Sequence, residues 1–293
     1  MFLSEFVALM GSPNGGKSTL LNTLVGRKVA IVTKKPQTTR TRIVGVYTTD
    51  EFQMIFVDTP GIHTPKNKLS EYMVKTARAA ARDVDVVMFV IDARIGLGER
   101  DKEILDDLPK NVPMLMVINK MDAVDRERLE EVRAQASQYD KPILVVSAKE
   151  NIGIGDLRDR LKEYLQPGPM FYPEDVITDQ PTEVLAAEII REKVLKGIGK
   201  EIPHGTGVEI ESFRKDDARD MYRIEAAIYC ERESHKHIII GAGGSKLKKI
   251  GTAAREDLEQ LLGAKVFLRL WVKVKTGWRN KTAVLRSLGY HGD

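Results

Sequence analysis

The sequence has little cysteine and no long apolar run. Cys230 is the only cysteine in 293 residues, which excludes an intrachain disulfide and favours a reducing compartment. No apolar stretch approaches the length of a membrane-spanning helix. An apolar run begins at Phe6, so close to the first residue that we expect no signal or transit peptide. These absences predict a cytoplasmic protein without a transmembrane segment.

Positive charge is concentrated towards the C-terminus. From Cys230 onward the chain carries 13 Lys/Arg and 6 Asp/Glu, a net charge of +7. Residues 1–229 carry 33 Lys/Arg and 36 Asp/Glu, a net charge of −3. The basic end either contacts an anionic partner, such as nucleic acid or lipid headgroups, or presents a solvated basic face. The length allows two domains, each with its own core.

The strongest motif is GSPNGGKS at residues 11–18, which fits G-x-x-x-x-G-K-[ST]. It follows an apolar run at 6–10 and precedes helical apolar spacing at 18–24. Glycine lets backbone N–H groups converge on one point, where the helix N-terminus adds its positive dipole end. We expect Lys17 to reach the outer phosphates of a nucleotide and the Ser18 hydroxyl to bind Mg²⁺. The alternative is a glycine-rich corner without a ligand.

Residues 1–165 alternate strand-like and helix-like segments. We expect strands at 6–10, 42–47, 53–57, 84–91, 112–118 and 142–146, and helices that start near residues 16, 68, 98, 125 and 153. This order predicts a mostly parallel six-stranded sheet with helices on both faces. Ligands of such sheets bind beyond the carboxyl ends of the strands.

Two segments are expected to complete a phosphate and metal site. The turn DTPG follows the strand at 53–57, where Asp58 can hold Mg²⁺ through a water and the N–H of Gly61 can sense a γ-phosphate. The alternative for DTPG is a simple Pro-Gly turn with no role in nucleotide binding. Residues 32–42 lack periodicity, which predicts a mobile loop whose Thr39, or alternatively Thr38, binds Mg²⁺ in the presence of the γ-phosphate.

The motif NKMD, directly after the strand at 112–118, points to the base. The carboxylate of Asp122 can accept two hydrogen bonds from guanine, whereas adenine lacks that pair of donors. Lys120 is expected to lie along the base and Asn119 to tie this segment to the phosphate loop. The tripeptide SAK follows the next strand, and the N–H of Ala148 can meet guanine O6. A helix N-cap at Asp122 is the alternative for the first motif.

The second half of the chain follows a proline-rich stretch at 166–175, which reads as a stiff linker. Helical spacing at 182–198 and two alternating, strand-like segments at 207–213 and 222–230 come next. A G-x-x-G loop then lies between two helices, and a strand at 265–275 completes the order helix-strand-strand-helix-helix-strand.

In KH domains such a loop clamps a single-stranded nucleic-acid backbone. We expect lysines to supply charge and the apolar run at 238–240 to face the bases. The residues expected to bind RNA are Ile239, Ile240, Gly241, Ala242, Gly243, Gly244, Lys246, Lys248 and Lys249. The alternatives are a plain helix-turn-helix corner and a membrane surface, although no strongly amphipathic basic helix with bulky aromatics supports the membrane.

The residues expected to bind the nucleotide are Gly11, Asn14, Gly15, Gly16, Lys17, Ser18, Thr19, Asp58, Gly61, Asn119, Lys120, Asp122, Ser147, Ala148 and Lys149. We expect Lys17, Ser18, Thr39 and Gly61 to act in catalysis, and Ser18, Thr39 and, through water, Asp58 to hold the metal. The set resembles the five G motifs of translation-factor-class GTPases.

Nearly the whole chain resembles the Era family of bacterial GTPases. The motifs that carry the resemblance are PQTTR at 36–40, DTPG at 58–61, PED at 173–175 with ITD at 177–179, EIIREK at 188–193, ERE at 231–233, LWVKVK at 270–275 with GW at 277–278, and LRSLGY at 285–290. The resemblance implies a P-loop GTPase domain at 1–166, a linker at 167–182 and an α+β type II KH domain at 183–293. It also implies binding to the 3′ end of 16S rRNA and to the immature 30S ribosomal subunit.

Three positions refine this expectation. The family usually has valine where Gly15 stands, which suggests looser nucleotide binding here. Ile62 occupies the position where many GTPases carry a water-orienting glutamine, so we expect slow intrinsic hydrolysis. Asn14 resembles the P-loop asparagine of potassium-activated GTPases, which makes K⁺ a candidate cofactor beside Mg²⁺; the alternative is a turn residue.

Three other functions compete with an RNA-binding GTPase switch. One is an ATP-dependent enzyme, against which Asp122 speaks. Another is an RNA-binding scaffold that holds GTP without useful turnover. The third is a GTPase associated peripherally with the inner face of the cell membrane, through its basic end.

Overall fold

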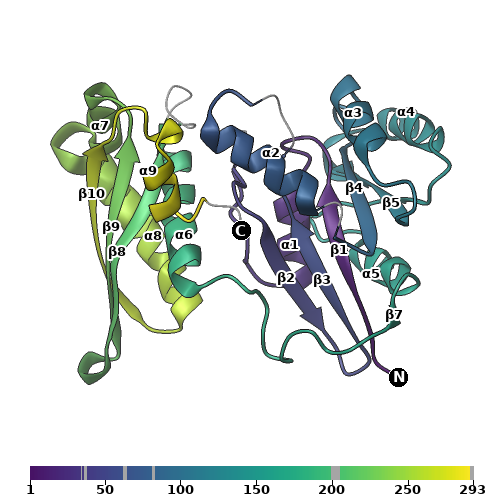
Figure 1. Cartoon of the computed structure of the whole chain (residues 1–293), viewed down its shortest axis with the longest axis horizontal. Helices are drawn as coiled ribbons and strands as arrows, with labels where there is room; N and C mark the ends of the chain where they lie inside the picture. The colour runs from purple at the N-terminus through teal and green to yellow at the C-terminus, as the bar shows by residue number, and fades with distance from the viewer. Residues whose placement is uncertain (34, 36–37, 62–64, 81–82, 199–204, 291–293) are drawn as a thin grey trace. The chain divides into compact units, whose positions relative to one another are not determined.

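The computed structural model describes residues 1–33, 35, 38–61, 65–80, 83–198 and 205–290. The chain divides into two compact units, one formed by Met1–Thr64 with Met73–Asp179 and the other by Pro65–Tyr72 with Gln180–Asp293. Figure 1 shows that each unit has a sheet of its own, with β1–β7 in the first and β8–β10 in the second. None of the helices in these ranges is both long and apolar enough to cross a membrane.

The sheet of the first unit is mostly parallel, as expected. Up to residue 167 the elements in chain order are β1 (Leu3–Met10), α1 (Lys17–Val25), β2 (Ile43–Thr48), β3 (Phe52–Asp58), α2 (Lys68–Ala80), β4 (Val86–Asp92), α3 (Glu99–Asp107), β5 (Met114–Asn119), η1 (Met121–Ala123), α4 (Arg126–Ser137), β6 (Ile143–Val145), α5 (Ile154–Lys162) and β7 (Gln166–Pro167). Helix α2 is divided, because residues 68–72 belong to the second unit and residues 73–80 to the first. The strand order is β2-β3-β1-β4-β5-β6, and only β2 runs antiparallel within it. The two-residue strand β7 pairs with β1 and makes this a seven-stranded sheet, one strand more than predicted.

Burial of the central strands explains why they read as continuous apolar runs. Every residue of β3 and β4 is buried, as expected for strands covered on both faces. Alternate side chains of β4 enter two separate cores, Val90 on one face and Ile91 on the other. Helices α1 and α5 contribute to the first core and α3 and α4 to the second. Because β3, β1, β4, β5 and β6 run parallel, their carboxyl ends lie at one edge of the sheet.

The proline-rich stretch is held against the first unit by specific hydrogen bonds. Beyond β7, the side-chain oxygen of Gln53 accepts hydrogen bonds from the N–H groups of Phe171 and Tyr172, at 2.9 and 3.0 Å. Farther on, the N–H of Val46 donates to the carbonyl of Ile177 at 2.9 Å, and Thr178 Oγ1 donates to the carbonyl of Val44 at 2.6 Å. This stretch, predicted to be a linker, thus runs along β2.

The second unit has the predicted order of elements. They are α6 (Thr182–Gly197), β8 (Gly207–Asp216), η3 (Asp217–Arg219), β9 (Met221–Cys230), α7 (Glu233–Ile240), η4 (Ala242–Gly244), α8 (Ser245–Leu262), β10 (Lys265–Val274), η5 (Trp278–Asn280) and α9 (Thr282–Ser287). The sheet order is β10-β9-β8, with β10 parallel and β8 antiparallel to β9. Buried residues of α6, α7 and α8 form one core with this sheet.

The segment after β10 is anchored to the second unit. The side chain of Trp278 is fully buried, and its Nε1 donates to the carbonyl of Gly205 at 3.0 Å. Arg279 forms two hydrogen bonds to Glu231, at 3.1 and 2.7 Å. Trp278 of the motif at 277–278 and Glu231 of the motif at 231–233 therefore have structural roles in the second unit.

Candidate functional site

The loop between β1 and α1 has a backbone that requires glycine at two positions. Gly11 has φ 128° and Gly16 has φ 98°, both in the left-handed region. A Cβ on Gly11 would lie 2.4 Å from the carbonyl oxygen of Val90, and one on Gly16 would lie 2.3 Å from Asn119 Nδ2. Gly15 is different, because its φ lies outside the left-handed region. A Cβ there would lie 3.4 Å from the carbonyl oxygens of Ser12 and Val90.

Helix α1 begins at Lys17 with an uncompensated N-terminus. Its first turn has no acidic residue and no side-chain cap. Among the helices of eight or more residues in the described part of the chain, only α8 shares the lack of a first-turn acid. The positive dipole ends of these two helices are therefore available to an anion.

Lys17 lies folded over the loop. Its side chain is buried, and Nζ donates to the carbonyls of Gly11 at 2.8 Å and Ser12 at 2.9 Å. Burial lowers the pKa of Lys17, while the charges of Asp58 and Asp101 act against that change. The amine is thus placed beside the loop that would enclose phosphates. Thr19, also predicted to bind the nucleotide, lies two residues farther along the first turn of α1.

Three predicted metal ligands converge next to this loop. Ser18 Oγ donates to Asp58 Oδ2 at 2.6 Å and shares a hydrogen bond of 2.9 Å with Thr39 Oγ1. Thr39 also contacts Asp58 Oδ2 at 3.4 Å. Thr38 is placed elsewhere, since its hydroxyl bonds Thr33 Oγ1 and the carbonyl of Lys35 within its own loop. Of the two alternatives, Thr39 is therefore the residue that faces Ser18 and Asp58.

The three oxygens fit a divalent cation. Asp58 is fully buried, and burial raises its pKa against the opposing effects of Lys17 and of the hydrogen bonds from Ser18 and Thr39. Its Oδ1 has no hydrogen-bond partner of good geometry among the described residues. Hydroxyl and carboxylate oxygens are the donors that Mg²⁺ prefers, and Mg²⁺ binds few of them directly because it retains water. A cation here would satisfy an otherwise costly buried carboxylate.

The turn after β3 lies against the phosphate loop. A Cβ on Gly61 would come within 2.8 Å of Pro13 Cγ, so only a glycine allows this approach. Thr59 Oγ1 donates to the carbonyl of Leu9 at 3.2 Å and secures the turn to β1. Ile62, on which the prediction of slow hydrolysis rests, lies outside the described residues, as do Pro36 and Gln37 of the loop before β2.

Asn119 connects the phosphate loop, its own loop and the loop that contains Ala148; only its contact with the phosphate loop was predicted. Its Nδ2 donates to the carbonyl of Gly15 at 3.1 Å, and its Oδ1 accepts the N–H groups of Lys120 and Ala148 at 2.8 and 3.0 Å. The Ala148 contact differs from expectation, because the N–H expected to meet guanine O6 is already donated inside the protein. A base at this position would have to share that N–H or displace Asn119.

The other base-side residues have different environments. Asp122 is exposed, and its Oδ1 accepts a hydrogen bond of 2.5 Å from the buried Ser147 hydroxyl. Ser147 therefore orients the carboxylate that is predicted to read the base. Lys149 is exposed and forms an ion pair with Glu150. Asn14 is also exposed and has φ 65°, a left-handed conformation that asparagine tolerates.

Asp92 and Asp101 belong to this site but were missed by the sequence reasoning. Asp92, the last residue of β4, accepts a hydrogen bond of 2.7 Å from Lys120 Nζ. Asp101, in the first turn of α3, accepts the N–H of Ser12 at 3.2 Å through Oδ1. A signal existed for Asp92, since an acid that ends a buried parallel strand lies at the edge where Asp58 and Asn119 were found. No comparable signal marks Asp101.

A second candidate site surrounds the G-x-x-G loop. Gly243 and Gly244 have φ 55° and 78°, and the N–H of Gly244 donates to the carbonyl of Gly241 at 3.1 Å. Ala242 and Gly243 are exposed at the tip. Helix α8 begins directly afterwards, with its uncompensated N-terminus and three lysines within five residues, Lys246, Lys248 and Lys249.

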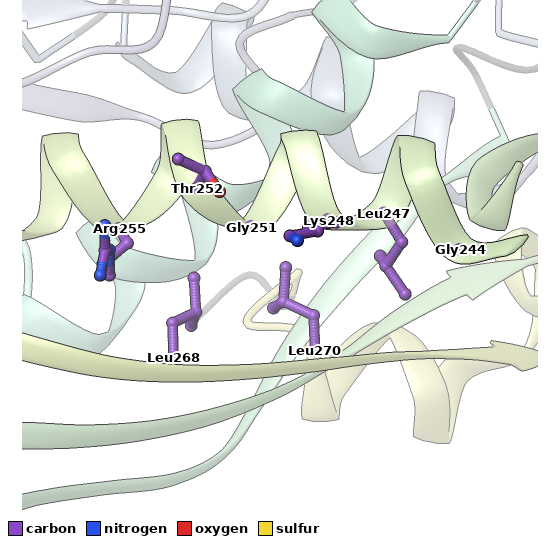
Figure 2. A pocket seen from close by; sticks show the side chains of 8 residues that line it. All are labelled: Gly244, Leu247, Lys248, Gly251, Thr252, Arg255, Leu268 and Leu270. Carbon is purple, nitrogen blue, oxygen red and sulfur yellow. The ribbon is translucent and has the colours of Figure 1, made fainter.

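A groove of about 430 Å³ runs from this loop between α8 and β10. Figure 2 shows Leu268 and Leu270 rising from β10 towards α8, with Leu247 directed at the strand. Along the helix the lining continues with Gly244, Lys248, Gly251, Thr252 and Arg255. The groove therefore has an apolar floor and basic side chains at its border. Sequence reasoning found Lys248 but missed Arg255 and both strand leucines, because their approach to α8 depends on tertiary packing.

One predicted RNA contact is wrong as a surface contact. Ile239 is fully buried in the core of the second unit, because residues 238–240 belong to α7 and a helix points successive side chains in different directions. Ile240 is half-buried, and neither residue lines the groove. Lys246 is half-buried and packs near Gly241, whereas Lys249 is exposed outside the groove lining.

Comparison with known families gives one match for each half of the chain. Residues 6–120 match the family described as 50S ribosome-binding GTPase. Residues 201–279 match the KH domain family. The first match covers the phosphate loop, Asp58 and Asn119, and the second covers the G-x-x-G loop and the groove.

Curated relatives and solved structures match over the full length. The chain is 48% identical over 292 residues to GTPase Era of Caldanaerobacter subterraneus subsp. tengcongensis, covering 99% of this chain and 98% of that protein. A crystal structure of an Aquifex aeolicus Era variant bound to GDP·AlF₄⁻ is 40% identical, with a TM-score of 0.95 and coverage of 99% and 100%. A crystal structure of Era with MgGDPNP and nucleotides 1506–1542 of 16S ribosomal RNA is 39% identical, with a TM-score of 0.95 over both whole chains.

Proposed function

The chain belongs to the Era family of GTPases, and on this basis we propose that it is a switch that binds the 3′ region of 16S rRNA through its KH domain and assists assembly of the 30S ribosomal subunit. The observation that carries the RNA part is the open groove beneath the G-x-x-G loop. The 16S rRNA nucleotides in the related Era structure support the choice of RNA. We place this activity in the cytoplasm and leave peripheral membrane association out of the proposal.

We propose a division of labour along the chain. Residues 1–166 form the GTP-binding domain, residues 167–182 the linker and residues 183–293 the RNA-binding domain. The two uncompensated helix N-termini support this division, since α1 and α8 each offer an anion site in a different part of the chain.

The proposed hydrolysis relies on positioning and charge. Ser18, Thr39 and, through a water, Asp58 would hold Mg²⁺, which would supply positive charge to the phosphates. Lys17 would turn from the carbonyls of Gly11 and Ser12 to the phosphates, and the loop N–H groups and Gly61 would hold the γ-phosphoryl group. This exchange is favourable, because the ammonium would leave two neutral carbonyl acceptors for negatively charged phosphate oxygens. We propose a slow intrinsic rate, because Ile62 offers no polar group to orient water.

Guanine selection is assigned to Asp122, with its carboxylate oriented by Ser147. Lys120 would flank the base, and Asn119 would keep the base-side loops in register with the phosphate loop. We further propose K⁺ as a second cofactor, bound with the help of Asn14. The exposed, left-handed position of Asn14 at the phosphate loop supports that assignment.

The groove suits single-stranded RNA rather than a duplex. Lys248 and Arg255 are exposed, and the structure records no ion pair for either within the described residues, so both are available to phosphates. The half-buried Leu247, Leu268 and Leu270 offer apolar contact to unstacked bases. The lack of side chains on Gly243 and Gly244 allows the RNA backbone to approach the loop closely.

The test is RNA binding by a variant that lacks both groove cations. We expect Lys248→Ala with Arg255→Ala to weaken binding of an RNA with the 16S 3′ sequence, and to reduce the slope of log Kd against log salt by about 1.4, at about 0.7 for each lost phosphate contact. The matched control removes two exposed lysines of the first unit, Lys110→Ala with Lys141→Ala. Equal losses in both variants would refute the groove as the binding site.

Single-turnover measurements of GTP hydrolysis distinguish the proposed switch from a scaffold that holds GTP without useful turnover. For the proposed switch, the GDP and GTP-analogue states should differ in RNA affinity, and hydrolysis should occur on the time scale of RNA release. A chain that binds RNA equally in both states would act as a scaffold instead.

A further inference from the structure

Asp92 lies at the centre of a cluster that joins three loops of the nucleotide site. Its side chain is buried, with 6% of the residue exposed. Oδ1 accepts the backbone N–H of Arg94 at 3.0 Å and Arg94 Nε at 2.9 Å, and Oδ2 accepts Arg94 Nη2 and Lys120 Nζ, each at 2.7 Å. All four acceptor positions of the carboxylate are thus in use. Arg94 thus fixes the carboxylate of Asp92 from one side, and Oδ2 also faces Lys120.

Lys120 uses that oxygen to reach across to the phosphate loop. Its backbone has φ 68° at the end of β5, and its Nζ also donates to the carbonyl of Asn14. The ammonium therefore bridges the end of β4 and the loop before α1. A lysine side chain has a flexible four-carbon stem, which loses rotamer entropy when the ammonium is held in place. Asn14 alone offers a single neutral acceptor for this purpose, whereas Asp92 adds a charge-assisted bond.

We propose that Asp92 is a positioning residue for the nucleotide, which acts by holding Lys120 against the phosphate loop before the nucleotide arrives. This inference rests on the nucleotide placement proposed above, in which Lys120 flanks the base. Preorganisation of Lys120 increases the affinity for the nucleotide, because the side chain need not be immobilised during binding. Arg94 contributes indirectly by keeping the carboxylate from rotating. Its own side chain is half exposed, so its removal should leave the core intact.

The decisive variant is Asp92→Asn, which keeps the shape and removes the charge. We expect Kd for GDP and KM for GTP to rise about tenfold, the lower end of the effect of a lost charge-assisted hydrogen bond. We expect kcat to stay within about twofold, because Lys120 contacts the nucleotide equally in the ground and transition states. A loss in kcat at unchanged KM would overturn the proposal.

A double-mutant cycle separates positioning from a general structural effect. In a Lys120→Met background, Asp92→Asn should change Kd for GDP by less than about twofold, because the lysine through which Asp92 acts is gone. A tenfold loss in that background as well would overturn the proposal. The matched control is Asp85→Asn, which removes a carboxylate just before the opposite end of β4. It should leave Kd unchanged.

Two further variants keep the outcome interpretable. Arg94→Ala should raise Kd by about twofold to threefold without loss of folding, and no change at all would contradict the tethering argument. Asp122→Asn tests the nucleotide placement itself through its preference for guanine or xanthine nucleotides. If that preference switches while Asp92→Asn leaves Kd and KM unchanged, the inference about Asp92 fails and the proposed site stands.

Discussion

Replacing Gly15 by alanine should tighten nucleotide binding, because nothing in the structure requires glycine there. A Cβ would lie 3.4 Å from the carbonyl oxygens of Ser12 and Val90 and 4.0 Å from Val90 Cγ1, at ordinary contact distances. Alanine also keeps both backbone hydrogen bonds of this residue. Its N–H donates to the carbonyl of Ser12 at 3.4 Å, and its carbonyl accepts Asn119 Nδ2 at 3.1 Å.

The magnitude follows from the conformational freedom that glycine adds to the loop without a nucleotide. Glycine-to-alanine changes at compatible positions stabilise the ordered state by about 0.4–1 kcal/mol. If the phosphate loop orders around the nucleotide, the same quantity enters the binding free energy. GDP should then dissociate about twofold to fivefold more slowly from Gly15→Ala. Gly15→Val should act in the same direction.

The assay is displacement of a fluorescent GDP analogue, followed by stopped flow. Gly16→Ala is the matched control, because the neighbouring glycine has φ 98° and its Cβ would lie 2.3 Å from Asn119 Nδ2. That variant should lose nucleotide affinity by at least tenfold. A Gly15→Ala protein that releases GDP as fast as or faster than the parent would refute the reasoning from loop freedom.

Three other perturbations test separate parts of the site and the fold. Asp122→Asn should weaken GDP binding about a hundredfold or more and create a preference for xanthine nucleotides, since the amide donates where the carboxylate accepted; competition of both nucleotides against labelled GDP measures this. GTP hydrolysis should be several times faster in K⁺ than in Na⁺, and Asn14→Ala should abolish that difference; equal rates in both salts with the parent protein would remove K⁺ from the proposal. Burial and the neighbouring Asp85 raise the pKa of Glu5 from 4.5 to about 8. Between those pH values the folded chain retains a proton that the unfolded chain has lost, so stability falls as pH rises through this window. Glu5→Gln should therefore raise the urea midpoint of the first unit at pH 9 and leave it nearly unchanged at pH 5.

The strand-end residues could be predicted from the sequence because one rule governs them. Asp58 and Asn119 each end a continuous apolar run that is typical of a buried strand. The carboxyl ends of parallel strands lie at one edge of the sheet. The same rule applies to Asp92, but no familiar motif surrounds it and it was missed. The choice between Thr38 and Thr39 could not be made, because adjacent residues of an irregular loop diverge in a direction that only the folded backbone determines.

The KH half shows a different limit of sequence reasoning. The order of elements followed from periodicity and from the glycines of the loop. The role given to Ile239 failed because an apolar triplet was treated as one surface, although α7 directs its middle residue into the core. Arg255, Leu268 and Leu270 line one groove between α8 and β10, and their alignment depends on tertiary packing that no local pattern encodes.

The hydrogen bonds between residues 177–178 and β2 have a consequence for any isolated GTP-binding fragment. Strand β2 is the last strand of its sheet, and an unpaired strand of this kind can recruit another chain and start aggregation. Ile177 accepts the N–H of Val46, Thr178 donates to the carbonyl of Val44, and Tyr172 packs against the apolar cluster of Val44, Val46 and Ile55. A fragment that stops at residue 166 would expose this edge strand. A fragment that continues to residue 179 would keep the segment that covers it, and should associate with itself less.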